Sequence, residues 1–129
     1  MDETKRRILI AVIDRIIPAD DFPSASQAGV MHYLEPMLAG DAREWGGPIS
    51  DGLATLEQTA VDRHGCSFAD ANADQQDALL TEIENQPFFR ELVILTSEGF
   101  YADPGNGGNR DEVSWKMIGF LPRTLGDMQ

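Results

Sequence analysis

Few side chains in this sequence could do chemistry by their type and spacing. His64 and Cys66 lie two residues apart, where an imidazole and a thiol could share a metal ion or act as base and nucleophile. A structural zinc site needs four such ligands, and a nucleophilic pair needs a third group that orients the base. His32 is the only other histidine, and Cys66 is the only cysteine. We therefore expect structural or surface roles for all three residues, with no catalytic residue and no metal ligand in this chain.

A second candidate is the adjacent carboxylate pair Asp20-Asp21, which could bind a cation or serve as an acid and a base. The pair lies in the stretch from Pro18 to Pro23, directly before Ser24, a residue type that often caps helices. Negative charge stabilises the N-terminus of a helix. A structural role for the two aspartates is the preferred interpretation.

Cofactor-binding motifs are missing from the sequence. There is no GxGxxG after a strand, no phosphate-binding GxxxxGK[ST] and no CxxCH, GxSxG or HExxH. The backbone of Gly105–Asn109 could cradle a phosphate, and Arg110 follows it, but such a cradle alone is a weak signal. The sequence therefore predicts no cofactor bound by this chain.

Length and charge limit the class of protein further. The chain has 129 residues, which predicts a single domain over 1–129. Its net charge is −12, so we exclude nucleic acid and anionic membranes as partners, because both need Lys/Arg patches. No apolar run is long enough to insert into a membrane. The apolar stretch Ile8–Ile13 is interrupted by Asp14 and Arg15, and it lacks the cleavage site of a signal peptide.

Helical periodicity alternates with proline and glycine along the chain, and no stretch has the two-residue period of a strand. Pro18 should end a first helix, Ser24 and Gln27 should cap a second, and Pro36 should kink or split that second helix before Gly40 caps its end. The predicted helices are Glu3–Ile17, a helix from Ser24 to about Leu38, Ile49–His64, a helix from Asn72 through Ile83, and a helix from Pro87 to about Phe100.

The C-terminal part has a different composition. Residues Ala102–Asp111 are rich in glycine and proline and predict a loop, Val113–Gly119 predicts a short amphipathic turn, and the tail from Leu121 predicts a frayed end. The fold class is therefore all-α, a small irregular bundle of about five to six helices with a Gly/Pro-rich C-terminal loop. Large aromatic residues flank the loop, which suits either a plug of the core or a buried interface with a partner.

Two separated stretches resemble the gluconate 2-dehydrogenase subunit 3 family. The N-terminal stretch is Asp14-Arg15-Ile16-Ile17-Pro18-Ala19-Asp20, continuing through Phe22-Pro23 to Ala28-Gly29. The C-terminal stretch is Asp103-Pro104, Gly107-Gly108-Asn109, Trp115 and Gly119-Phe120. Phe68, Gln75-Gln76, Leu79-Leu80 and Phe88-Phe89 match the middle of the family, so the resemblance covers roughly residues 8–120.

The resemblance implies a non-catalytic small subunit that stabilises or chaperones a large FAD-dependent dehydrogenase of the glucose–methanol–choline (GMC) type. Such complexes oxidise sugars or sugar acids, as gluconate 2-dehydrogenases or glycoside 3-dehydrogenases, and they pass electrons to a cytochrome c subunit or another acceptor. The flavin would belong to the partner. The residues expected at the partner interface are Phe22, Pro23, Phe100, Tyr101, Asp103, Pro104, Gly107, Gly108, Asn109, Trp115 and Phe120.

Many family members carry a twin-arginine export signal. Here Arg6-Arg7 is not followed by a sufficient apolar segment, which favours a cytoplasmic location, or a periplasmic one if an export signal has been removed. The chain also departs from the family pattern at Asn106, where an aromatic residue is common, and at Ser114, where glycine is common. Two other functions stay open: a stand-alone enzyme or ligand binder that uses Asp20, Asp21, Asp103 or His64, and a structural homo-oligomer.

Overall fold

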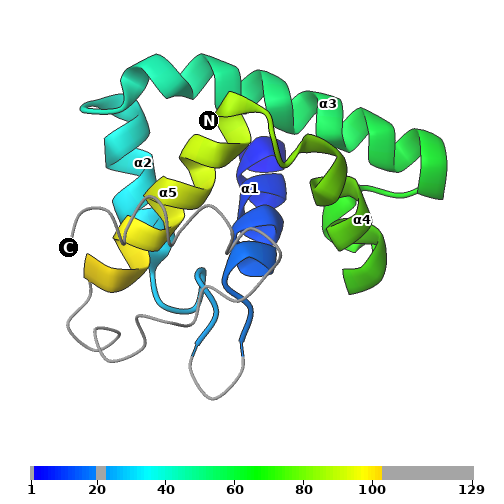
Figure 1. Cartoon of the computed structure of the whole chain (residues 1–129), viewed down its shortest axis with the longest axis horizontal. Coiled ribbons are helices and arrows are strands. Elements are labelled where there is room, and N and C mark those ends of the chain that lie inside the picture. The colour runs from blue at the N-terminus through cyan, green and yellow to red at the C-terminus, as the bar shows by residue number, and fades with distance from the viewer. Residues whose placement is uncertain (1, 20–22, 103–129) are drawn as a thin grey trace.

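The computed structural model describes residues 2–19 and 23–102, and this part of the chain is all-α, as predicted (Figure 1). It contains no strand. The predicted Gly/Pro-rich loop from residue 103 onward, the amphipathic turn and the tail lie outside the described residues. The elements are α1 (Glu3–Ile16), α2 (Val30–Ala39), the 3₁₀ turn η1 (Arg43–Trp45), α3 (Gly46–His64), the 3₁₀ turn η2 (Phe68–Asp70), α4 (Ala73–Ile83) and α5 (Pro87–Ala102).

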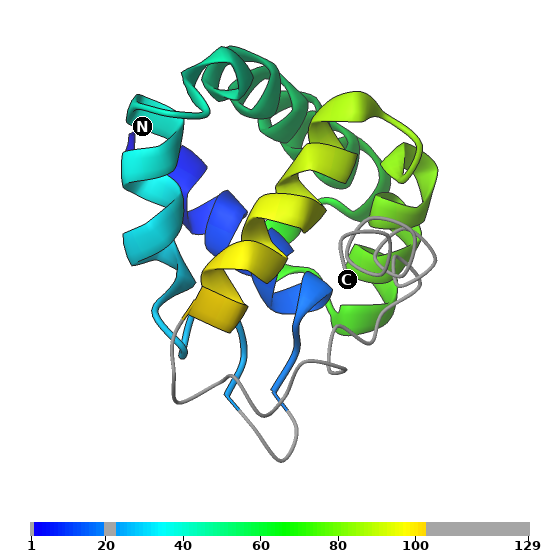
Figure 2. The ribbon, with the colours of Figure 1, turned by 60° about the vertical axis from the view of Figure 1, so that its left-hand side comes forward.

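Helix α1 lies at the centre of the bundle, with α2 and α5 on one side, α4 on the other and the long α3 across one end (Figures 1 and 2). Its apolar residues recur at helical spacing and form one continuous buried face. Leu9, Ile13 and Ile16 have no exposed surface, and Ile8 and Val12 are almost completely buried. The other helices pack around this face, which therefore forms the middle of the core.

The start of α1 is capped and its end is set by a proline. The Asp2 carboxylate accepts a hydrogen bond from the backbone N–H of Lys5 at 2.8 Å, which satisfies one free donor of the first turn. The helix ends at Ile16, one residue before the predicted end, because the residue that precedes Pro18 is pushed out of the helical region.

The predicted start of the second helix at Ser24 is wrong. Ser24 and Gln27 do exchange the two predicted hydrogen bonds, from Ser24 N to Gln27 Oε1 at 3.0 Å and from Gln27 N to Ser24 Oγ at 3.4 Å. They close only a single turn, because Gly29 adopts a left-handed φ of 84°. The Val30 N–H then reaches back to the Ala25 carbonyl at 3.1 Å, which is the closure of a Schellman motif. Helix α2 begins only after this motif, at Val30.

Pro36 does not split α2, which is continuous from Val30 to Ala39. A proline inside a helix removes one backbone hydrogen bond and crowds the preceding turn. Packing compensates here, because Leu34 is fully buried and Met31 is 5 % exposed. Gly40 caps the end of the helix as predicted, with its N–H bonded to the Met37 carbonyl.

The remaining helix ends follow local signals. Helix α3 starts at Gly46, earlier than predicted, since Pro48 falls in the first turn, where backbone N–H groups have no partner within the helix. Gly65 ends α3 with a φ of 71°, as predicted. The predicted capping box of Asn72 and Gln75 opens α4, and Pro87 is the first residue of α5.

A glycine in α3 allows α5 to approach closely. A Cβ atom placed on Gly52 would lie 2.3 to 2.5 Å from three ring carbons of Phe88, a residue that is 7 % exposed. The ring therefore packs directly on the backbone of α3, and a side chain at position 52 would have to displace it.

We predict that Gly52→Ala destabilises the protein by about 2 kcal/mol, since inserting an atom into a packed contact typically costs 1–3 kcal/mol. Denaturant unfolding would measure the change. Gly47→Ala is the matched control, because no atom lies within 4 Å of a Cβ at that position. Equal stabilities of the two variants would contradict this account of the contact.

Candidate functional site

Asp14 connects the end of α1 to the turn that follows the helix by hydrogen bonds. It belongs to the N-terminal stretch that carries the family resemblance. Its two carboxylate oxygens accept hydrogen bonds from the Ser26 backbone N–H at 2.7 Å and from the Ser26 hydroxyl at 2.6 Å. The Ala25 N–H also donates to the Ile17 carbonyl at 3.0 Å. These contacts hold the two ends of the segment from Pro18 to Ser24 together, which gives Asp14 a structural role.

Arg15, the next residue of the same stretch, joins α1 to α4. Its guanidinium donates two hydrogen bonds to the Asp77 carboxylate, at 2.9 and 3.1 Å. Both side chains are about one-fifth exposed. The hydrogen bond to Asp77 is the largest cause of a raised pKa for Arg15, so the guanidinium stays charged. A two-pronged ion pair of this kind fixes orientation as well as distance.

The described part of the N-terminal family stretch and the end of α5 meet at one end of the bundle. The end of α1, the segment before α2 and the end of α5 all lie there in both views (Figures 1 and 2). Because residues 14–19 and 23–29 are far in the sequence from residues 99–102, only the fold brings these segments together. We refer to this end as the signature end of the bundle.

Three of the predicted interface residues fall within the described part of the chain. Pro23 is exposed, Tyr101 is half-buried, and Phe100 is 1 % exposed and belongs to the core. The rings of Phe100 and Tyr101 meet edge to face, with centroids 5.6 Å apart. The buried ring of Phe100 therefore supports the ring of Tyr101 by direct contact. The other predicted interface residues lie outside the described part: Phe22, Asp103, Pro104, Gly107, Gly108, Asn109, Trp115 and Phe120.

Beside the signature end, Tyr33 of α2 packs against α5. Its hydroxyl donates a hydrogen bond to Glu98 at 3.2 Å, and a Cβ on Gly99 would lie 2.9 Å from the tyrosine ring. Burial is the main reason that the pKa of Tyr33 is raised, and the negative charge of Glu98 adds to it. The phenol therefore stays protonated and keeps its role as a donor.

The described surface offers a partner little apolar area. Val61, at 45 % exposure, is the one large hydrophobic residue that is exposed in the part of the chain that the structure describes. A protein interface normally has an apolar centre built on aromatic anchors. The described helices alone do not supply such a centre.

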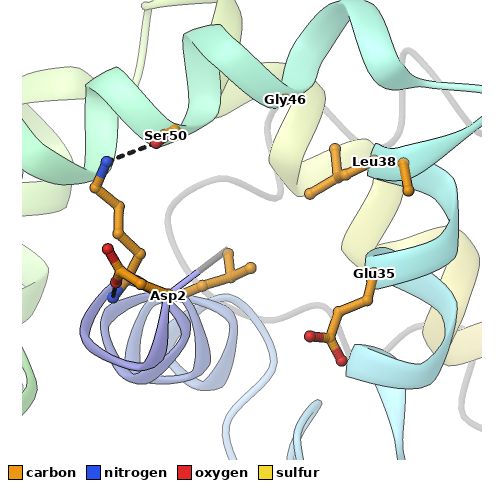
Figure 3. A pocket seen from close by; sticks show the side chains of 8 residues that line it. Asp2, Glu35, Leu38, Gly46 and Ser50 are labelled. Atoms are coloured by element: carbon orange, nitrogen blue, oxygen red, sulfur yellow. Dashed lines mark hydrogen bonds between the residues drawn. The ribbon is translucent and has the colours of Figure 1, made fainter.

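A polar cavity lies at the other end of the bundle, and the sequence reasoning missed it. It has a volume of about 360 Å³ and lies between the first turns of α1 and α3 and the second half of α2 (Figure 3). Lys5, Glu35 and Ser50 contribute its polar groups together with Asp2. The residues come from three helices, and no short motif connects them, so no sequence signal could have identified the cavity.

The residues first considered for chemistry do not form a cluster. His64 is the last residue of α3 and Cys66 follows just after the cap, both half-buried, whereas His32 is exposed on α2. Asp20 and Asp21 lie outside the described residues. Over residues 2–19 and 23–102, no group of three or more His, Cys, Asp or Glu side chains could hold a metal ion. No helix in this part is long and apolar enough to cross a membrane.

Glu91 of α5 provides a test of the electrostatics around this helix. Burial is the main cause of its raised pKa, and the charges of Glu98 and Glu44 raise it further. A carboxyl group with a raised pKa in the folded state destabilises the fold when it ionises. The free energy of unfolding therefore falls as the pH rises from the ordinary pKa of a glutamate toward the raised pKa of Glu91 in the folded state.

We predict that Glu91→Gln raises the melting temperature at pH 7 by a few degrees at most and leaves it unchanged below about pH 4, where both states are protonated. Thermal unfolding across this pH range would measure the effect. Asp51→Asn removes the same charge from an exposed position on α3 and serves as control. A gain that persists at low pH would contradict the ionisation account.

The family comparison agrees with the resemblance carried by the two stretches of the sequence. Residues 3–122 match the model of the family described as Gluconate 2-dehydrogenase subunit 3. Searches of curated proteins and of solved structures find no match. The match spans nearly the whole chain, including all five described helices. The chain therefore belongs to the gluconate 2-dehydrogenase subunit 3 family.

Proposed function

We propose that this chain is the non-catalytic small subunit of a FAD-dependent sugar or sugar-acid dehydrogenase complex, of the gluconate 2-dehydrogenase or glycoside 3-dehydrogenase type. The observation that carries the proposal is the family match over residues 3–122. The large partner would be a GMC-type flavoprotein that holds the FAD and performs the chemistry. Electrons would pass on to a cytochrome c subunit or another acceptor.

The hydrogen bonds of Asp14 and Arg15, the two charged residues of the N-terminal family stretch that the structure describes, support a role in contact with a partner and not in catalysis. Asp14 holds Ser26, and Arg15 holds Asp77, so both side chains are engaged in fixing the fold. A reactive group would instead need a free face toward a substrate and a partner that tunes its pKa. Asp14 and Arg15 thus support the fold at this end of the bundle.

We expect the partner contact at the signature end. Pro23 is exposed there and Tyr101 is supported by the buried Phe100. Since the described helices expose so little apolar surface, the apolar anchors of the interface should come from beyond residue 102, with Trp115 and Phe120 as the main candidates.

Stabilisation of the partner follows from mass action. A protein that binds only the folded form of the large subunit stabilises it by RT ln(1 + [L]/Kd), which is about 2.7 kcal/mol at a concentration one hundred times the Kd.

We predict that Trp115→Ala and Tyr101→Ala each weaken binding of the large subunit by about 2 kcal/mol or more, roughly thirtyfold, as expected for aromatic anchors. Co-purification of the two co-expressed subunits, followed by titration, would measure the loss. Val61→Ala is the control, because it removes exposed apolar surface from α3, away from the signature end.

Circular dichroism of each isolated variant would show whether the helical bundle is still folded. Undiminished recovery of the large subunit with a folded Trp115→Ala chain would contradict the interface assignment. Turnover of a sugar by the purified chain and an artificial electron acceptor, with no flavoprotein present, would favour the stand-alone enzyme instead.

A further inference from the structure

The polar cavity at the end opposite the signature end contains charges that do not pair with each other. Lys5 and Asp2 line the cavity from the start of α1, Glu35 lines it from α2 and Ser50 lines it from α3. Figure 3 shows Glu35 on the side opposite Asp2, with Ser50 above. Leu9 and Leu38 contribute apolar surface to the lining. Because this cavity is remote from the proposed partner contact, what it binds is independent of the proposed function.

Lys5 supplies the positive charge in the lining of this cavity. Its ammonium group donates a hydrogen bond to the Ser50 hydroxyl at 2.5 Å. Among the described residues, no carboxylate lies within ion-pair distance of Lys5, whereas the guanidinium groups of four arginines each have one: Arg6, Arg7, Arg15 and Arg63. A lysine paired only with a neutral hydroxyl, at the wall of a cavity, can accept an additional anionic partner.

Glu35 offers the opposite charge on the far wall. One of its oxygens, Oε2, accepts a hydrogen bond from Arg6 at 3.2 Å, and the side chain is 45 % exposed. Its carboxylate points into the space between α1 and α2 (Figure 3). Lys5 and Glu35 therefore face one cavity from two sides without forming an ion pair with each other.

The lining disfavours a ligand with a single charge. A simple anion that approached Lys5 would be repelled by Asp2. A simple cation that approached Glu35 would be repelled by Lys5 and by Arg6, which pairs with Oε2 of Glu35 and leaves Oε1 as the oxygen without a partner among the described residues. A molecule with both charges meets an opposite charge at each end. The volume of about 360 Å³ is at the lower end of the range for ligand pockets, which suits a small molecule.

We propose that this cavity binds a small zwitterion, with its carboxylate at Lys5 and Ser50, its ammonium group at Glu35 and its methylene groups on Leu9 and Leu38. Charge-assisted hydrogen bonds would orient the two ends, and the apolar part of the lining would contribute by burying the methylene groups. The ligand class is that of an amino acid whose two charges are separated by a short aliphatic chain.

A series of amino acids with increasing charge separation tests the proposal on the full chain. The probes are glycine, 3-aminopropanoate, 4-aminobutanoate and 5-aminopentanoate, and the readout is the chemical shift of the Gly46 and Ser50 amides during titration. We expect saturable binding with a Kd of about 1 mM at best, which corresponds to about −4 kcal/mol. Affinity should peak at one chain length, which reports the gap between Lys5 and Glu35.

Substitutions test each end separately. Lys5→Met keeps the aliphatic stem and Glu35→Gln keeps the shape, and each should weaken the best probe about tenfold or more, equivalent to 1.4 kcal/mol. Ser50→Ala, which leaves all charges in place, should weaken it less. Arg63→Gln removes a cation at the far end of α3 and should leave binding unchanged.

Single-charge analogues provide the decisive comparison. Pentanoate and butylamine have a main chain of the same length as 4-aminobutanoate, and each lacks one of its two charges. The proposal is overturned if either analogue binds as tightly as the zwitterion, or if no member of the series shifts the cavity amides. Since the shifts are recorded on the folded chain without a partner, neither outcome bears on the role as a small subunit.

Discussion

The structure depends above all on the burial of one face of α1. Five apolar side chains of this helix are at most 2 % exposed, and every other described helix packs around them or around their neighbours. Burying a large aliphatic side chain contributes about 1.5–3 kcal/mol, so this face is a major source of the stability of the bundle. The helix occupies the middle of the molecule because no other position would cover all of that surface.

The polar residues of α1 complete this arrangement. Its cationic side chains reach four different elements: Lys5 contacts α3, Arg6 contacts α2, Arg7 contacts η2 and Arg15 contacts α4. Exposed pairs such as Arg7–Asp70 contribute little to stability, but the part-buried Arg15–Asp77 pair fixes the position of α4. The arginines of α1 are thus paired with carboxylates of the same chain, which has a net charge of −12. The charges that remain on the surface are mostly negative, which suits a partner surface with basic groups.

Local signals in the sequence predicted much of the fold. Some helix ends depend on residues only a few positions apart, so the sequence predicts them directly. These ends are set by the capping box of Asn72 and Gln75, the left-handed Gly65 and the first-turn Pro87. The start of α2 could not be predicted in this way, because the reciprocal hydrogen bonds of Ser24 and Gln27 are equally compatible with one turn and with a whole helix. There the left-handed Gly29 decided the outcome.

Contacts between residues that are far apart in the sequence could not be predicted from it. The Arg15–Asp77 pair and the Lys5–Ser50 hydrogen bond join residues 62 and 45 positions apart, and nothing in the residue types indicates which cation meets which partner. The N-terminal stretch was identified from the family resemblance. Only the structure shows that Asp14 and Arg15 form hydrogen bonds and an ion pair within the chain. Phe100 was expected at an interface because the sequence does not show which aromatic ring is buried. Its ring lies in the core and meets the ring of Tyr101 edge to face.

The central claim is that this chain contributes shape and contact to a flavoprotein and not reactive groups. The most direct measurement is the melting temperature of the large subunit, with its flavin bound, at increasing concentrations of this chain. The account predicts a melting temperature that rises with concentration, as mass action requires, while the flavin stays with the large subunit. An unchanged melting temperature, or flavin recovered on the small chain after the two are separated, would contradict it.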